Sequence, residues 1–267
     1  MNRTFVSKLM TEQAVAPRRS GLHRTLFAGF EYLSMLLGLG AFAGLCLLWL
    51  PCAMLFRLVL PTRWGRPLAR RMHMLGFRCY LGFLTVFCGF RFDLAELDRL
   101  RDDGSMILVA NHPSLLDAVM IISRFPDAVC IIKAALMNNI LYGAAARLAC
   151  YIRNDGPVEM LLRARRELGL GTRLILFPEG TRTSRFPISP CSASAGLIAK
   201  VATVPIQTAL IECDVPYLGK AWPLLRRPPL PLHFRIRLGE RFDPPQDVNA
   251  FTAHLEQYFR DQLQTGT

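Results

Sequence analysis

The stretch Ser105–Asp117, SMILVANHPSLLD, decides the fold and holds the first polar residues that could carry chemistry. Its first six residues, Ser105–Ala110, form a short and almost wholly apolar run, which predicts a buried strand. A helical pattern follows over Leu115–Ser123. A buried strand that leads directly into a helix is typical of an α/β domain with a parallel sheet. In such domains the active site lies beyond the carboxyl ends of the strands.

The chain after Phe92 repeats this alternation. Further buried strands are predicted at Val129–Ile132, Arg173–Phe177 and Val204–Ile211, and helices at Asn138–Ala149, Val158–Leu168 and Ser194–Val201. The proline-rich stretch Pro223–Pro231 is expected to be a rigid loop. His233–Phe242 alternates residue by residue and predicts an edge strand, and Asp247–Leu263 predicts an amphipathic helix capped by Asp247. We therefore expect residues 92–267 to form an α/β domain with a mostly parallel sheet flanked by helices.

Residues 1–91 are of a different kind. No charged residue occurs from Tyr32 to Phe56, and these 25 residues would span roughly 37 Å as a helix, enough to cross a bilayer core of about 30 Å. The alternative, a buried core helix, is rarely apolar on all sides over such a length. A second apolar run, Cys79–Phe90, is short for a full crossing. A re-entrant or interfacial hairpin therefore competes with a single membrane span.

The net charge of +12 is concentrated in this N-terminal region, where residues 1–91 carry a balance of +10 and residues 92–267 only +2. Basic residues flank the apolar run on both sides: Arg3, Lys8, Arg18, Arg19 and Arg24 before it, and Arg57, Arg63, Arg66, Arg70 and Arg71 after it. Charge beside an apolar run, rather than on the folded domain, favours anionic membrane lipid over nucleic acid as the partner.

The eight cysteines contain no Cys-x-x-Cys pair and mostly have apolar neighbours. A cleaved signal peptide is not expected, because the apolar run is too long and starts too late. The cysteines are therefore predicted to be reduced, buried thiols of a protein that faces the cytosol, and no metal site is expected from them.

His112 and Asp117 could form a catalytic pair. Pro113 fits the first turn of a helix, which would place His112 just before the helix and Asp117 inside its start. The carboxylate can then bond one imidazole nitrogen and leave the other as a base of fixed tautomer. Without a neighbouring nucleophile, such a pair suits deprotonation of a substrate hydroxyl. The alternative is that both residues only stabilise the start of the helix.

A second group of polar residues follows the predicted strand that ends at Phe177, in the sequence FPEGTRTS. Gly180 allows a tight turn, and Arg182 offers a forked donor suited to phosphate. Hydroxyl donors are added by Thr181, Thr183 and Ser184. Glu179 would repel phosphate, so we expect it to orient Arg182 or to accept from a substrate hydroxyl. The alternative is a polar turn between a strand and a helix.

Together, NHPSLLD (residues 111–117) and FPEGTR (177–182) resemble the two signature blocks of the lysophospholipid acyltransferase family, the 1-acylglycerol-3-phosphate acyltransferases and their relatives. These blocks are the His-x4-Asp and Phe-Pro-Glu-Gly-Thr-Arg motifs. Further similarity covers Lys133, Tyr151–Asp155 and Val204–Ile206, so that the resemblance extends over residues 90–245.

The resemblance implies that His112 deprotonates an acceptor hydroxyl, which attacks the thioester carbonyl of an acyl donor, while Asp117 orients the imidazole. It implies no cofactor and no metal; the donor would be acyl-carrier protein or acyl-CoA, and the acceptor a lysolipid. The domain should lie at the inner or cytoplasmic membrane and face the cytosol, where acyl thioesters are made. The expected substrate-binding residues are Asn111, Lys133, Arg153, Glu179, Gly180, Thr181 and Arg182.

One departure concerns the acceptor. Many family members have a basic residue shortly after the second block, whereas Phe186–Gly196 contains no Lys or Arg. This weakens the case for a phosphate-headed acceptor such as lysophosphatidic acid and leaves open a lyso-aminolipid or a pathway-specific lipid. A lipid hydrolase or transacylase that uses the same pair also stays open, as does a non-catalytic lipid-binding protein.

Overall fold

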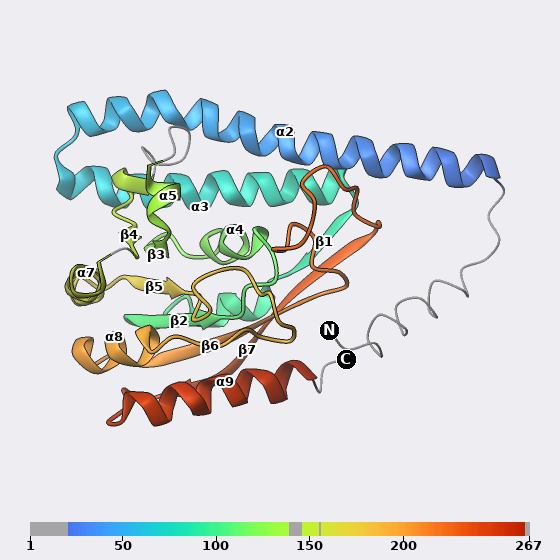
Figure 1. The fold of residues 1–267 in the computed structure, drawn as a ribbon. Helices are drawn as coiled ribbons and strands as arrows, with labels where there is room; N and C mark the ends of the chain where they lie inside the picture. The colour runs from blue at the N-terminus through green and yellow to red at the C-terminus, as the bar shows by residue number, and fades with distance from the viewer. Residues whose placement is uncertain (1–20, 139–145, 155, 265–267) are drawn as a thin grey trace.

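The computed structural model describes residues 21–138, 146–154 and 156–264, which form three layers with a sheet in the middle (Figure 1). The strands are β1 (Phe90–Asp93), β2 (Met106–Ala110), β3 (Ala128–Ile132), β4 (Ile152–Arg153), β5 (Arg173–Leu176), β6 (Ile206–Cys213) and β7 (Leu232–Phe242). The helices are α2 (Gly21–Val59), α3 (Thr62–Phe87), the 3-10 helix η2 (Ala95–Leu100), α4 (Leu116–Ile122), α5 (Ala134–Met137), α7 (Pro157–Gly169), α8 (Ser194–Ala202) and α9 (Val248–Gln264).

The sheet has the order β1-β7-β6-β2-β5-β3-β4, and every neighbouring pair is parallel except β6 and β7. Helices α3 and α4 cover one face, and α8 and α9 cover the other (Figure 1). Strand β2 lies near the centre and all five of its residues are buried, as a continuous apolar run in a parallel sheet predicts. The predicted fold class is confirmed.

One prediction about the edges of the sheet is wrong, and two short edge strands were not predicted. Strand β7 is not an edge strand, because it lies between β6 and β1. Its alternating pattern comes from the two faces of the sheet, because Leu232, Phe234 and Ile236 are buried while His233 and Arg235 between them are exposed. The four-residue strand β1 and the two-residue strand β4 were too short to be predicted. The helix predicted over residues 138–149 falls mostly outside the described residues.

The C-terminal helix follows the sequence closely. α9 spans Val248–Gln264, and the side chain of Asp247 accepts hydrogen bonds from the backbone N–H groups of Asn249 (2.9 Å) and Ala250 (3.0 Å). These bonds satisfy N–H groups that a helix start leaves without partners, so Asp247 is the predicted cap.

The N-terminal region forms a pair of helices rather than a separate domain. The apolar run 32–56 lies inside the 39-residue helix α2, which continues through Pro51. The second run, 79–90, is the end of the 26-residue helix α3 together with the first residue of β1. Since β1 spans Phe90–Asp93, the expected boundary between residues 91 and 92 lies within a strand of the sheet.

Helix α3 is fixed to the folded domain by arginines that the sequence had suggested for lipid. The Arg70 side chain is almost fully buried, donates to Glu167 Oε2 on α7 (2.6 Å) and also donates to the carbonyl of Ala149 (3.0 Å). Arg66 Nη1 lies 3.7 Å from the same carboxylate. A buried charge must be paired, so these two arginines hold α3 in place instead of facing lipid.

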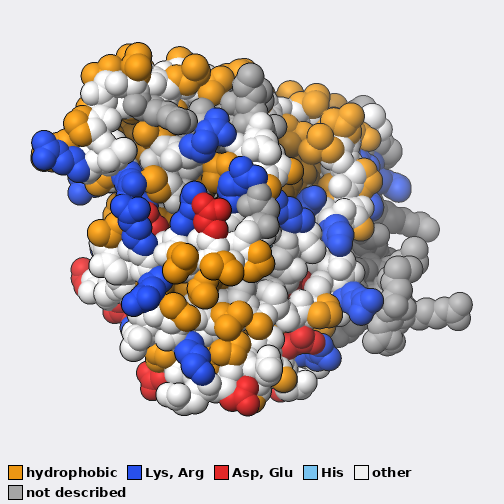
Figure 2. Space-filling model, turned by 60° about the vertical axis from the view of Figure 1, so that its left-hand side comes forward, with side chains coloured by type: hydrophobic (Ala, Val, Ile, Leu, Met, Phe, Trp, Pro, Cys, Tyr) orange, Lys and Arg blue, Asp and Glu red, His pale blue; other side chains and the backbone are white. Residues whose placement is uncertain are grey.

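Helix α2 exposes an apolar surface. Among the described residues, Arg24–Phe56 is the one helical segment long and apolar enough to cross a membrane, and only 17% of its most apolar window is buried. This low burial argues against the core-helix alternative. Seven exposed apolar residues are spaced by three or four positions, or by sums of these steps, and so share one face: Leu26, Phe30, Leu33, Leu37, Leu47, Met54 and Leu58. We call them the α2 stripe; hydrophobic side chains also gather over this helix in Figure 2.

All eight cysteines are free, as expected, but they are not all buried. Cys88 and Cys130 are buried, whereas Cys52 on α2 and Cys79 on α3 are exposed. The two exposed thiols lie on the helices of the apolar N-terminal pair, where apolar neighbours in sequence do not imply burial in the domain.

The buried imidazole of His73 on α3 should make stability depend on pH. It packs against the rings of Trp49, Phe77 and Tyr151, and burial lowers its pKa from 6.5 to about 4, with the backbone of Ala69 acting weakly in the opposite direction. Between these values the unfolded chain binds a proton that the folded chain does not. Stability should therefore fall by up to about 3 kcal/mol as the pH drops from 6.5 to 4.

Denaturant unfolding in detergent at several pH values between 7 and 4 measures this effect. A His73→Phe variant has no such proton to bind, so its free energy of unfolding should change less over the same window. Parallel pH profiles for the two proteins would contradict the role of His73.

Candidate active site

His112 and Asp117 form the predicted pair. His112 Nδ1 lies 2.8 Å from Asp117 Oδ2, and the Asp117 side chain is fully buried. Helix α4 begins at Leu116, so Asp117 is its second residue. Pro113 lies three residues before the helix rather than in its first turn, because a turn over residues 113–115 comes first. The positions of the histidine before the helix and of the aspartate at its start are nevertheless as expected.

Asp117 also stabilises the start of the helix, as the alternative to a catalytic role proposed. Its Oδ2 accepts from the backbone N–H of Ser114 (2.7 Å), so the carboxylate stabilises the turn as well as the imidazole. Burial raises the pKa of Asp117, the charge of Glu179 adds to the rise, and the contacts with His112 and Ser114 oppose it. A carboxylate beside Nδ1 is placed to stabilise the positive charge that the imidazole gains when it takes a proton from a substrate.

Phe177 holds the imidazole from one side. Its ring stacks on His112 with a centroid distance of 4.0 Å and an interplanar angle of 17°. Only 16% of the His112 side chain is exposed, and among the described residues Nε2 has no hydrogen-bond partner. With Nδ1 bonded to Asp117 and the ring plane fixed, Nε2 is the nitrogen left to act on a substrate.

Glu179 joins the two sequence motifs. Its Oε1 accepts from the backbone N–H of His112 (2.9 Å) and from the Thr183 hydroxyl (2.7 Å), and its Oε2 accepts from the backbone N–H of Ser189 (2.9 Å). The Thr183 N–H donates in turn to the carbonyl of His112 (2.7 Å). Glu179 therefore positions the histidine backbone. Among the described residues no hydrogen bond or ion pair joins it to Arg182, which the sequence had led us to expect it to orient.

Replacing Glu179 with Ala should destabilise the protein. The N–H groups of His112 and Ser189 would lose their acceptor, and each such buried group left without a partner costs on the order of 1–3 kcal/mol. Thermal or denaturant unfolding in detergent measures the loss. Glu179→Gln keeps the shape and one acceptor oxygen, so it should cost less than Glu179→Ala; equal losses would contradict the hydrogen-bonding role.

The Arg182 side chain donates hydrogen bonds to backbone carbonyls of the protein and is not left free in the site. Its Nη1 donates to the carbonyls of Leu218 (2.8 Å) and Gly219 (3.0 Å), in the loop of residues 214–231 that joins β6 to β7. We call this segment the β6–β7 loop. The predicted tight turn before Arg182 is present, since Gly180 has φ +62°, a conformation that favours glycine. Thr181 has no hydrogen bond among the described residues and stays a candidate for substrate contact.

The β6–β7 loop is part of the site, which the sequence did not indicate. The Ser114 hydroxyl donates to the carbonyl of Tyr217 (2.7 Å), and the Leu115 N–H donates to that of Leu218 (3.3 Å). A Cβ at Gly219 would lie 2.9 Å from the carbonyl oxygen of Pro113 and 2.7 Å from that of Pro216. Only glycine permits this close approach of the loop to the turn that carries His112.

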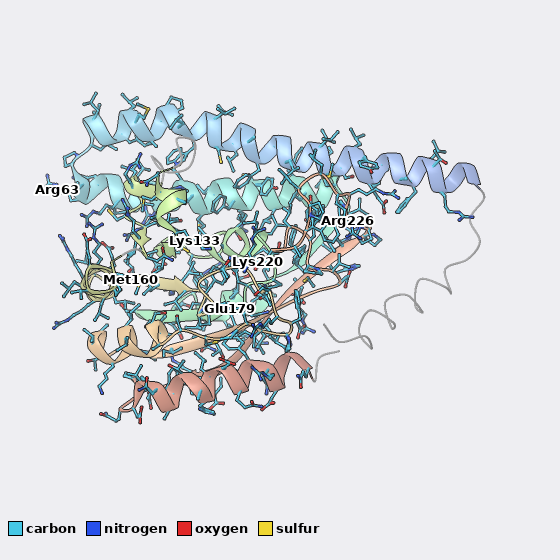
Figure 3. The ribbon with its side chains drawn as sticks, viewed as in Figure 1. Arg63, Lys133, Met160, Glu179, Lys220 and Arg226 are labelled. Atoms are coloured by element: carbon cyan, nitrogen blue, oxygen red, sulfur yellow. The ribbon has the colours of Figure 1, made fainter. Side chains whose placement is uncertain are left out.

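Of the remaining predicted site residues, Asn111 is next to His112 but bonds to the neighbouring strand, and Lys133 and Arg153 lie at other strands. The Asn111 amide donates to the carbonyl of Ile211 (2.9 Å) and accepts from its N–H (2.7 Å), which favours a structural role between β2 and β6. Lys133 is exposed at the end of β3, two strands from β2, and Arg153 lies on β4, three strands from β2 (Figure 3). At about 4.8 Å per strand, β4 is roughly 14 Å from β2.

Arg153 lines a separate hollow of about 500 Å³ that adjoins α3 and α7. The other charged residues around this hollow are Arg66, Arg147, Arg163, Arg166 and Glu167. The structure thus brings together His112, Asp117, Glu179, Gly180 and Arg182, but not Arg153. Among the described residues, no three His, Cys, Asp or Glu side chains are placed to hold a metal ion.

Comparison with known proteins gives this geometry a context. Residues 91–212, which include both motifs, match the family model described as Acyltransferase. These residues form an acyltransferase domain. The resemblance to lysophospholipid acyltransferases is confirmed by relatives and by the fold.

Two relatives and one solved structure are similar to this acyltransferase. The protein acl-1 of Caenorhabditis elegans, provisionally named a 1-acyl-sn-glycerol-3-phosphate acyltransferase, is 27% identical over 67% of this chain and 72% of its own. The human 1-acyl-sn-glycerol-3-phosphate acyltransferase beta is 26% identical over 56% of this chain and 55% of its own. The crystal structure of PlsC, a 1-acyl-sn-glycerophosphate acyltransferase from Thermotoga maritima, shares the fold with a TM-score of 0.60 and 20% identity, covering 91% of this chain and 96% of PlsC.

Proposed function

We propose that this acyltransferase moves a fatty acyl group from an acyl thioester to the hydroxyl of a lysolipid, 1-acylglycerol-3-phosphate or a related molecule. The observation that carries the proposal is the His112–Asp117 contact of 2.8 Å, which is joined through Glu179 to the second motif. The names of the similar proteins support the same acceptor class. The donor would be acyl-CoA or acyl-carrier protein.

In the proposed reaction His112 Nε2 takes the proton of the acceptor hydroxyl as its oxygen attacks the thioester carbonyl carbon. Asp117 lies against Nδ1 and stabilises the imidazolium that forms. The tetrahedral intermediate then expels the thiolate as the carbon–sulfur bond breaks, and the thiolate takes the proton from Nε2. An ester and a free thiol result, and the imidazole is neutral again. The step needs neither an acyl-enzyme nor a metal ion.

We propose that the α2–α3 pair binds the membrane as an interfacial hairpin. One side of α2 packs on α3, where the Tyr80 hydroxyl donates to the carbonyl of Gly38 (3.2 Å) and the Phe42 ring lies 5.3 Å from that of Tyr80. Since α3 is fixed to the domain through Arg70, α2 lies along the domain and exposes the α2 stripe outward. An apolar face on a helix held in this way suits shallow insertion better than a crossing. The domain would face the cytosol.

Acyl transfer by the purified full-length protein in detergent tests the proposed function. A labelled acyl-CoA and a labelled acyl-carrier protein would each be offered with lysophosphatidic acid, a lyso-aminolipid and no acceptor. We expect a diacyl product with at least one lysolipid. Release of free fatty acid without acceptor would instead support a hydrolase, and acyl exchange between lipids without thioester would support a transacylase. Lipid binding with no turnover of any substrate would support a non-catalytic protein.

A further inference from the structure

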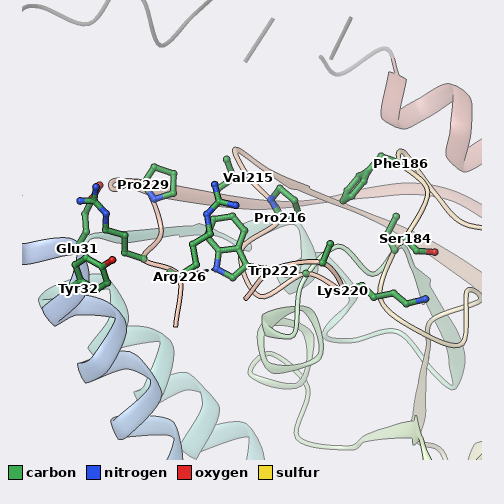
Figure 4. Close-up of a pocket in the computed structure, with 14 residues that line it drawn as sticks. Glu31, Tyr32, Ser184, Phe186, Val215, Pro216, Lys220, Trp222, Arg226 and Pro229 are labelled. Atoms are coloured by element: carbon green, nitrogen blue, oxygen red, sulfur yellow. Dashed lines mark hydrogen bonds and ion pairs between the residues drawn. The ribbon is translucent and has the colours of Figure 1, made fainter. Parts of the chain in front are cut away.

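A pocket of about 1040 Å³ adjoins the active site on the side of the β6–β7 loop (Figure 4). Thr183 and Ser184 of the second motif line one part of it, and Glu31 and Tyr32 of α2 line another. Between them lies the β6–β7 loop. Of the polar residues that the sequence suggested for substrate contact, Thr183 and Ser184 line this pocket, and the others do not.

The charges around the pocket are mostly positive. Its lining contains the cations Lys220, Arg226 and Arg227, and one carboxylate, Glu31. Arg227 Nη1 lies 2.6 Å from Glu31 Oε2, so these two neutralise each other. Arg226 lies over the Trp222 ring at 4.8 Å from its centroid. An unbalanced positive charge therefore remains in the pocket and attracts an anion.

Lys220 is the cation without a partner. It is exposed, and among the residues that the structure describes its ammonium group makes no hydrogen bond or ion pair. Ser184, which lies toward the same end of the pocket in Figure 4, is exposed too, and its hydroxyl has only a weak contact with the Ser189 hydroxyl (3.3 Å). An ammonium and a hydroxyl are both donors suited to phosphate oxygens.

The backbone next to Lys220 is held by the catalytic motifs. Arg182 binds the carbonyls of Leu218 and Gly219, and Gly219 immediately precedes Lys220. The Ser114 hydroxyl binds the carbonyl of Tyr217. Since Lys220 follows directly on a segment bonded to both signature motifs, its backbone has a fixed place relative to His112, and its side chain extends from there.

We propose that Lys220, with the Ser184 hydroxyl, forms a phosphate-binding site for one of the two substrates, and that the β6–β7 loop supplies the cation that Phe186–Gly196 lacks. This inference rests on the proposed function. The phosphate could belong to the head group of the lysolipid or to the phosphopantetheine part of the acyl donor, and the same donors on the protein would bind either.

The experiment compares wild type, Lys220→Met and Lys220→Arg with purified full-length protein in detergent. KM is measured separately for lysophosphatidic acid, for monoacylglycerol as a neutral acceptor, and for the acyl donor. Losing one charged hydrogen bond to a phosphate should raise the KM of the phosphate-bearing substrate by about 10- to 100-fold. Lys220→Arg keeps the charge and should recover much of the affinity. Lys200→Met, which removes a lysine on α8, is the matched control.

The separate KM measurements show which of the two substrates carries the phosphate that Lys220 binds. A rise in KM for lysophosphatidic acid alone, with monoacylglycerol unaffected, identifies the acceptor head group; a rise in the donor KM alone identifies the donor. Unchanged KM values for both substrates in Lys220→Met overturn the site. If wild type transfers no acyl group, the proposed function fails, and the site is judged by another readout. That readout is protection of Lys220 from an amine-reactive label by lysophosphatidic acid or by the acyl donor, measured by mass spectrometry; no protection by either overturns the site.

Discussion

His112→Ala should lower the rate of acyl transfer by on the order of 10²–10⁴-fold, the usual contribution of a general base. Within the described part of the chain the imidazole ring has Asp117 as its one polar partner, so its removal deletes the base while leaving the backbone bonds to Glu179 and Thr183 in place. The folded state should therefore persist, and KM for the acceptor should change far less than kcat. Initial rates with labelled acyl thioester at saturating acceptor measure the effect.

The chain offers a matched control in a second histidine–aspartate pair. His233 Nδ1 lies 2.8 Å from Asp214 Oδ2, the same distance as in the catalytic candidate, but both side chains are more than half exposed. His233→Ala removes an identical contact away from the two motifs and should leave the rate within about twofold, as surface substitutions usually do. Equal rates in His112→Ala and wild type would remove His112 from the mechanism.

Replacing three leucines of the α2 stripe, Leu33, Leu47 and Leu58, with Ser should release the protein from membranes. Each is more than half exposed, and burying a leucine side chain in an apolar medium contributes about 1.5–3 kcal/mol. Allowing for partial burial, losing three should weaken binding to lipid vesicles by at least about 100-fold. Flotation of the purified protein with anionic vesicles measures the bound fraction.

The control for this variant uses exposed apolar residues on another helix. Val158, Leu162 and Leu170, on or next to α7, are 72%, 58% and 62% exposed, much like the three leucines of the α2 stripe. Their replacement with Ser should leave vesicle binding unchanged. If the α2 variant still floats as wild type does, or if both variants detach equally, α2 is not the membrane contact that we propose.

Local patterns predicted the centre of the sheet but not its edges. Strand β2 and its neighbour β5 are short apolar runs whose burial on both faces follows from composition alone. Strand β1 could not be found in the same way, because FRFD is held in place by pairing with residues 232–235, far along the chain. The charged first half of α3 likewise gives no apolar signal; its helix is stabilised by contacts such as Arg70 with Glu167.

In the candidate site, too, contacts within a short segment were predicted and contacts between distant segments were not. The sequence motif placed His112 beside Asp117 because only four residues lie between them, and local geometry restricts so short a segment. It did not reveal that Phe177 stacks on the imidazole or that Arg182 binds the β6–β7 loop, because both depend on contacts between distant segments. A sequence feature of the loop that could have suggested its role is Gly219 followed by Lys220, a glycine beside a basic residue.

The position of the pocket between the second motif and α2 has a consequence for kinetics. Glu31 and Tyr32 line its far side and belong to the helix that we propose lies in the lipid interface. An acceptor could then enter sideways, keeping its acyl chain among neighbouring lipids while its head group reaches Lys220. The rate would depend on the mole fraction of lysolipid in the bilayer surface rather than on its bulk concentration, so dilution with inert lipid would slow turnover even when total lysolipid is constant.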